Sequence, residues 1–242
     1  MRFFKLLGLV WIIFLVGCAA QQKPIAVESS FFKDSGKSIG IIRTSAPTAA
    51  TGYTGSIGLL DYAIISAVNS GLDEYLAKLT FPEYESFITD LTNSIEKTGL
   101  DVTLINEPLT EDEVKNLKTP KEGVSQNDFS KYKEKYGLDY LMLINFKTIG
   151  TVRSYYGPVP TSEPLATSFI TGQIIDLSTN KLSWYSDINI QKTIPSPWDE
   201  ADSNYPNLTN SIYQSQNDAF RTIKSELKIL KAEIEAKHKE SK

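Results

Sequence analysis

The sequence has very little of the two residue types that carry most metal and nucleophile chemistry, with one cysteine and one histidine in 242 residues. A single cysteine excludes an internal disulfide and a thiolate zinc cluster. The histidine, His238, lies near the end of the chain, in a charged segment that does not suit a Ser-His-Asp or Cys-His nucleophile. We therefore predict no catalytic residue, no metal and no cofactor, and we expect that the protein is not an enzyme.

The sequence also lacks an excess of positive charge. Lys and Arg number 25 against 29 Asp and Glu, which gives a formal net charge of −4. Proteins that bind phosphate backbones need the opposite sign. Nucleic acid is accordingly not an expected partner.

No apolar run is long enough to span a bilayer, which takes about 20 residues. The longest run near the start covers residues 6–16 and follows Arg2 and Lys5. A short apolar run after basic residues, followed by small residues, is typical of a secretory signal peptide. Residues 1–17 are therefore predicted to target the protein and then to be removed.

The tetrapeptide Leu15-Val16-Gly17-Cys18 ends this apolar run and resembles the lipobox of bacterial lipoproteins. The resemblance implies that Cys18 is acylated and becomes the first residue of the mature protein. Two or three acyl chains suffice for a stable membrane anchor. Ala19 and Ala20 follow in place of the Asp that such lipoproteins use for inner-membrane retention, which implies the periplasmic face of the outer membrane. The alternative is an unmodified cysteine near the cleavage site.

The remaining chain has the composition of an ordinary soluble domain, with 41% hydrophobic and 22% charged residues. Residues 18–36 are predicted to be the lipidated cysteine and a flexible tether. Residues 37–242 are predicted to form a single α/β domain that ends in a long amphipathic helix.

Five strands are predicted from β-branched, alternating or continuous apolar runs, at residues 37–43, 101–106, 140–146, 165–177 and 182–194. The run Tyr140–Phe146 is almost wholly apolar, which is typical of a central strand buried on both faces. Residues 177–181 suit a tight hairpin turn between the last two strands.

Helices are predicted between these strands from apolar residues spaced three and four apart and from capping boxes. Leu60, Ile64 and Val68 begin one apolar face, which Leu72 and Leu76 continue past a bend at residues 70–71. Three further helices are predicted to open at the boxes Thr80/Glu83, Thr110/Glu113 and Ser125/Asp128, with stops at residues 99, 117 and 137. Ile223 and Leu227 belong to the apolar stripe of the terminal helix, which we expect to lie on the sheet; a coiled coil is the alternative.

The resulting order β-α-α-β-α-α-β-β-β-α predicts an α+β fold, with a mixed five-stranded sheet and helices packed against it. Long helical crossovers make the first three strands parallel, and short turns make the last three an antiparallel meander.

Two polar segments between these elements resemble binding loops but lack the required spacing. Residues 44–58 are rich in Ser, Ala, Thr and Gly and are predicted to be a mobile loop, because no phosphate-loop motif is met. The acidic cluster at residues 199–204 lacks the spacing of a calcium loop and is predicted to be a solvated turn.

The stretch from Asp176 to Trp184, Asp-Leu-Ser-Thr-Asn-Lys-Leu-Ser-Trp, resembles a hairpin of bacterial envelope lipoproteins built on the fold of the TolB amino-terminal domain and the curli-secretion lipoprotein. The lipobox and the strand order add to this resemblance, which spans residues 37–235 as topology and nine residues as a motif. A generic turn with Trp184 packed beneath the sheet is the alternative interpretation.

Two apolar loops rich in proline are the candidate partner-binding surface. Tyr155, Tyr156, Pro158 and Pro160 lie between two predicted strands, and Trp198 follows the last strand. Aromatic side chains in loops stiffened by proline lose little entropy on docking. The alternative is that these aromatics fold back and cap the core.

These features predict a lipid-anchored, non-enzymatic adaptor or binding module in the cell envelope, with the membrane and an envelope protein as partners. The alternative is an oligomeric subunit of a secretion or surface-appendage assembly complex, in which homo-oligomerisation is the main activity.

Overall fold

The computed structural model describes residues 22–28, 30–33, 36–110, 114–117 and 121–228. The predicted signal peptide, Cys18 and His238 lie outside the described residues. The fold is α+β with a mixed sheet, as predicted.

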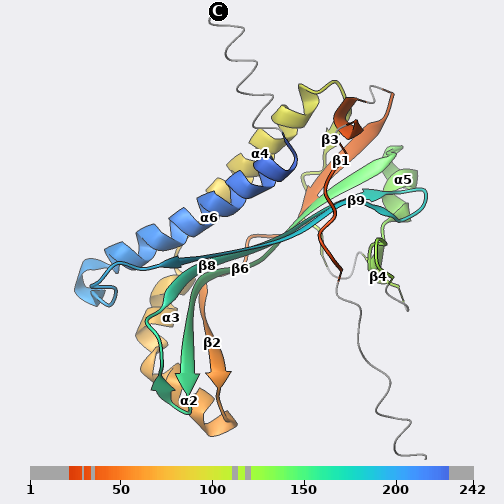
Figure 1. The fold of residues 1–242 in the computed structure, drawn as a ribbon. Helices are drawn as coiled ribbons and strands as arrows, with labels where there is room; N and C mark the ends of the chain where they lie inside the picture. The colour runs from red at the N-terminus through yellow and green to blue at the C-terminus, as the bar shows by residue number, and fades with distance from the viewer. Residues whose placement is uncertain (1–21, 29, 34–35, 111–113, 118–120, 229–242) are drawn as a thin grey trace, which may run out of the picture.

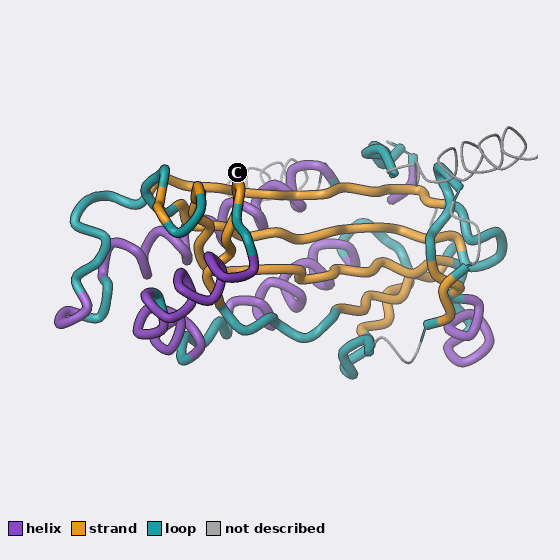
Figure 2. The backbone as a smooth tube through the Cα atoms, turned by 90° about the horizontal axis from the view of Figure 1, so that it is seen from below, coloured by secondary structure: helices purple, strands orange, loops and turns teal. Residues whose placement is uncertain are grey.

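The centre of the molecule is a sheet in the order β3-β1-β6-β8-β9 (Figure 1). β1 (Ser38–Arg43) lies between β3 (Asp101–Leu104) and β6 (Tyr140–Tyr156), and both pairings are parallel. β8 (Leu165–Asp176) and β9 (Leu182–Thr193) complete the sheet as an antiparallel meander. These are the five predicted strands with the predicted directions. Two further strands pair with β6, so the sheet has seven strands rather than the predicted five. The longest of them run side by side along the molecule (Figure 2).

The predicted mobile loop at residues 44–58 is wrong, because it contains the strand β2 (Ala50–Ser56). β6 continues to Tyr156, past the point where β1 ends, and β2 pairs in parallel with this free edge. Gly150 of β6 permits the close approach: its φ is +134°, and a Cβ there would stand 2.1 Å from the Ala50 carbonyl oxygen. The small residues that predicted a loop fit a strand here because β propensity depends on the available partner.

Two helices, α4 (Glu83–Glu96) and α6 (Pro206–Glu226), cover one face of the long strands (Figure 1). Their apolar sides meet in the core, where the rings of Phe87 and Phe220 stack at 4.1 Å. The sheet contributes fully buried side chains to this main core, among them Met142, Ile144, Ile170, Ile174 and Trp184.

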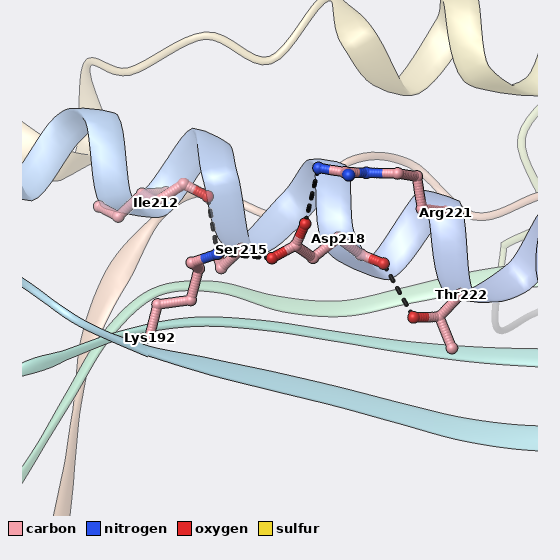
Figure 3. Close-up of polar contacts among 6 residues, drawn as sticks. All are labelled: Lys192, Ile212, Ser215, Asp218, Arg221 and Thr222. Atoms are coloured by element: carbon pink, nitrogen blue, oxygen red, sulfur yellow. Dashed lines mark hydrogen bonds and ion pairs between the residues drawn. The ribbon is translucent and has the colours of Figure 1, made fainter.

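The terminal helix packs on the sheet, which confirms that prediction for its described part. Ile223 and Leu227 are buried. Polar contacts fix the same helix to β9: Lys192 Nζ donates to the Asp218 carboxylate, which also accepts from Arg221 at 2.9 Å (Figure 3). The helix begins well before the predicted stripe, at Pro206, and residues 229–242 lie outside the described residues.

The opposite face of the sheet is covered at one end by α5 (Ser130–Tyr136). Phe129 and Tyr132 pack there in a second core with Leu141, Leu143, Ile175 and Leu177. Side chains of a strand alternate between its two faces, so the run from Tyr140 feeds both cores. This confirms the prediction of a central strand that is buried on both faces.

Part of the predicted flexible tether is also packed at this α5 end. Ile25 pairs with Tyr185 of β9, Gln22 accepts a hydrogen bond from the Gly123 N–H at 2.8 Å, and Val27 is buried. The tether prediction is therefore wrong for residues 22–28.

The capping boxes predicted at Thr80/Glu83 and Ser125/Asp128 do not form, and Glu113 of the third box lies outside the described residues. The N-cap of α4 is Pro82, without a side-chain hydrogen bond, and α5 begins at Ser130 rather than Ser125. Residues 115–116, predicted as helix, form the short strand β4 (Lys115–Asn116), paired with β5 (Asn127–Asp128). Gly137 ends α5 as predicted, in the left-handed conformation at φ +70°.

Candidate interaction surface at the β6–β7 end of the sheet

The two predicted binding loops lie at the same end of the sheet. Leu165 of β8 pairs with Val152 of β6 and with Thr193 of β9. The ends of β6 and β9 that lead into the two loops therefore lie on either side of β8, at the same end of the sheet. Arg153 links them: its guanidinium carbon lies 6.0 Å from the centre of the Tyr155 ring and 5.1 Å from that of Trp198. The structure therefore brings Tyr155 and Trp198 together at this end of the sheet.

Tyr155 itself is not exposed, which corrects the expectation of an exposed aromatic loop. Its side chain is 4% exposed, its hydroxyl accepts a hydrogen bond from Asn69 at 3.2 Å, and its ring meets Tyr53 edge to face at 5.7 Å. The cause is the helix pair α2 (Leu59–Val68) and α3 (Ser70–Ala77), which lies beside this part of the sheet (Figure 1). Tyr155 is thus a cap of the core, as the alternative interpretation stated.

Tyr156 points the other way. Strand residues alternate between faces, so Tyr156 lies on the face opposite α2 and α3, and it is 74% exposed. Its antiparallel partner on the same face is Val159 of β7 (Val159–Pro160), at 61% exposed. Pro158 and Pro160 are exposed, whereas Trp198 is half-buried against the main core.

The β6–β7 hairpin is held in one conformation by backbone hydrogen bonds. The Gly157 N–H donates to the Ser56 carbonyl at 2.8 Å, and the Thr161 N–H donates to the Ser154 carbonyl at 2.8 Å. The Arg153 Nε donates to the Ser162 carbonyl at 2.7 Å. A surface fixed in this way loses little conformational entropy when a partner binds.

A partly buried polar contact supports this end from within. The Tyr53 hydroxyl donates to the Asp73 carboxylate at 3.1 Å. Burial, followed by the negative charge of Asp73, raises the pKa of Tyr53 well above its ordinary value. The tyrosine therefore stays neutral and keeps donating across the physiological range of pH.

The exposed face of α2 was not predicted from the sequence. Leu60, Ile64 and Val68 were expected to continue the apolar face of Leu72 and Leu76, but only the last two are buried. The helix ends at Val68 and restarts at Ser70, so the two stripes do not lie on one line. The predicted bend is present, and it turns the first stripe outward.

Two further kinds of site are absent from the described residues. Within them, no group of three or more His, Cys, Asp or Glu side chains could hold a metal ion. A search of the same residues finds no helix long and apolar enough to cross a membrane.

No protein-family model and no curated protein sequence matches this chain. Among solved structures, the chain is similar to the hypothetical protein CT253 from Chlamydia trachomatis, with a TM-score of 0.39 and 10% identity over 79% of this chain and 95% of that one. It is also similar to the PelC dodecamer from Paraburkholderia phytofirmans, with a TM-score of 0.30 and 9% identity over 80% and 93%. Lipoprotein GNA1162 from Neisseria meningitidis matches with a TM-score of 0.27 and 13% identity over 74% and 99%.

Proposed function

We propose that the protein is a lipid-anchored, non-enzymatic binding module of the bacterial cell envelope. In this proposal Cys18 holds it at the periplasmic face of the outer membrane, and the β6–β7 hairpin binds an envelope protein. The lipobox supports the anchor. The observation that carries the binding role is the exposed pair Tyr156 and Val159 on a rigid hairpin.

The arrangement of the sheet suits this role. Cys18 lies four residues before Gln22, a distance of at most about 14 Å for an extended chain. Gln22 contacts Gly123, which lies beside Leu182 at the end of the sheet opposite the hairpin. The twelve residues of β8 alone span about 40 Å between these ends. The sheet would therefore hold the hairpin away from the anchored end and toward a partner in the periplasm.

Capture of partners by the full-length protein tests the proposal. The double variant Tyr156→Ser with Val159→Ser should reduce capture from native membranes by at least about tenfold, because aromatic anchors at rigid positions dominate interface energies. The matched control is Thr179→Ala with Lys181→Ala, two exposed residues of the β8–β9 turn at the other end. Equal loss in both variants, or no loss in the first, would contradict the proposal.

A second candidate function, the oligomeric subunit of a secretion or surface-appendage assembly complex, is supported by a different observation. The outer face of α2 is apolar, and no described element covers it. An uncovered helix face of this kind favours self-association as part of the activity.

A further inference from the structure

The outer face of α2 consists only of apolar residues. The helix directs Asp61, Ile65 and Asn69 inward, at spacings of four, and Ile65 is its buried hydrophobic residue. The residues on the other side are all exposed: Leu59, Leu60, Ala63, Ile64, Ala67 and Val68. Leu59 is 91% exposed and Val68 is 78% exposed. In a water-soluble protein, the apolar face of a helix is normally buried against another element.

The local structure explains why this face cannot turn into the core. Asn69 ends α2, where its side-chain amide donates to the Ile65 carbonyl at 2.8 Å and to the Tyr155 hydroxyl at 3.2 Å. On the inner side, Tyr62 meets Tyr53 edge to face at 5.6 Å. These contacts fix the rotation of α2 about its axis, and its outer face stays uncovered within the described part of the chain.

We propose that this face is covered by the same face of a second copy of the chain, in a two-fold dimer that packs α2 against α2. The proposal deepens the second candidate function and rests on its self-association. It does not depend on the adaptor role, because Tyr156 and Val159 lie on the opposite face of the sheet.

The distribution of charge favours a second copy. A two-fold interface places a patch against the same patch of the second copy, so a charged residue within it lies near a charge of the same sign. The three acidic residues of this region are all engaged elsewhere. Asp61 accepts from the Gly58 N–H at 2.9 Å, Asp73 accepts from Tyr53, and Glu74 pairs with Lys78 at 2.7 Å. The face is therefore self-complementary without like-charge contacts.

The size and shape of the face also fit. A standard interface takes about 800 Å² from each partner, and side chains the size of leucine, isoleucine and valine at this exposure supply most of that area. Ala63 and Ala67 lie one turn apart between the larger side chains, which permits an interaxial distance of about 8 Å.

A bilayer is a poorer occupant. Helices that lie in the membrane interface carry Lys and Arg on their polar side. Residues 44–77 contain no Lys or Arg and three acidic residues, so anionic lipids would repel this region. It also lies at the end of the sheet opposite Gln22, from which the chain leads to Cys18.

Disulfide trapping in the full-length protein tests the dimer in its native membrane. The sequence has one cysteine, Cys18, so Ala63→Cys and Ala67→Cys each add one thiol at the centre of the face. Mild oxidation should give a species of twice the monomer mass for at least one of them. The matched control is Asn93→Cys, on the exposed side of α4, which should stay monomeric like the wild type.

Leu60→Glu with Val68→Glu, placed in the trapping variant, should lower the dimer fraction at least about tenfold, because the interface would then bury four charges. Ser86→Glu with Asn93→Glu adds the same charge on α4 and should leave trapping unchanged. The proposal is overturned if neither thiol gives a dimer, if the trapped species is a different protein, or if both pairs of substitutions act alike.

Discussion

Trp184 of β9 packs directly over Gly172 of β8, and a Cβ on the glycine would stand 2.1 Å from the indole Cη2. The indole is buried beneath the sheet, and its Nε1 donates to the Glu226 carboxylate of α6 at 3.3 Å. The glycine therefore makes room for the side chain that joins β9 to α6.

We expect Gly172→Ala to destabilise the protein by about 1–3 kcal/mol, because the indole must shift in a packed core. Gly71→Ala is the control: it lies in α3 with no atom within 4 Å of the added Cβ. It should stabilise by about 0.5–1 kcal/mol through helix propensity. Urea unfolding of both variants measures the difference, and similar midpoints would contradict the packing argument.

The adjacent tyrosines Tyr155 and Tyr156 should separate stability from binding. Tyr155→Ala removes a buried ring and its hydrogen bond with Asn69, and we expect a cost of about 3 kcal/mol or more. Tyr156→Ala alters an exposed side chain and should change stability by less than about 0.5 kcal/mol. Melting temperatures, measured beside partner capture, check this. If Tyr155→Ala melts like the wild type, the ring does not cap the core.

Five strands and their directions could be predicted because each of these strands carries its own signal. The continuous apolar run from Tyr140 and the hairpin turn at Asn180, with φ +59°, need no knowledge of distant residues. β2 could not be found in this way. Its residues are small and polar, and only the free edge of β6 beyond Ile144 gives them a partner.

The candidate surface was predictable in place but not in orientation. The sequence placed Tyr155 and Tyr156 at the correct end of the sheet, yet which of them is covered depends on α2 and α3. The stripe Leu60, Ile64 and Val68 has the period of a core face, and periodicity alone does not distinguish a core from an interface. For the missed strand β2, the sequence did offer one signal, Gly55. This glycine adopts φ +104° where β2 lies close to the backbone of Tyr155 in β6.

The anchor prediction rests on the sequence and has a direct test. Acylation requires the Cys18 thiol, so Cys18→Ser should give an unprocessed or soluble protein whose folded domain is unchanged. Fractionation after a high-salt wash, with circular dichroism as the check on folding, measures both. A variant that still sediments with membranes would show that the lipobox interpretation is wrong.

Alkaline pH should destabilise the protein through three tyrosines whose pKa is raised. Partial burial raises the pKa of Tyr185 to about 12, and burial also raises the pKa values of Tyr53 and Tyr84 above the ordinary value. In the unfolded chain these groups ionise near pH 10. Below pH 10 they are neutral in both states, so their contribution to stability is complete. Above pH 10 the unfolded state loses protons first, and stability falls as pH rises toward the folded pKa values.

Absorbance at 295 nm, which reports tyrosinate, should therefore rise in two stages. The second stage, from Tyr53, Tyr84 and Tyr185, should accompany loss of the folded circular dichroism signal. Tyr53→Phe removes one of the late groups and should reduce the slope of stability against pH above 10, while Tyr156→Phe, at an exposed position, should leave that slope unchanged. If all twelve tyrosines ionise in a single step near pH 10 while the protein stays folded, Tyr53, Tyr84 and Tyr185 are not shielded from water as the structure has them.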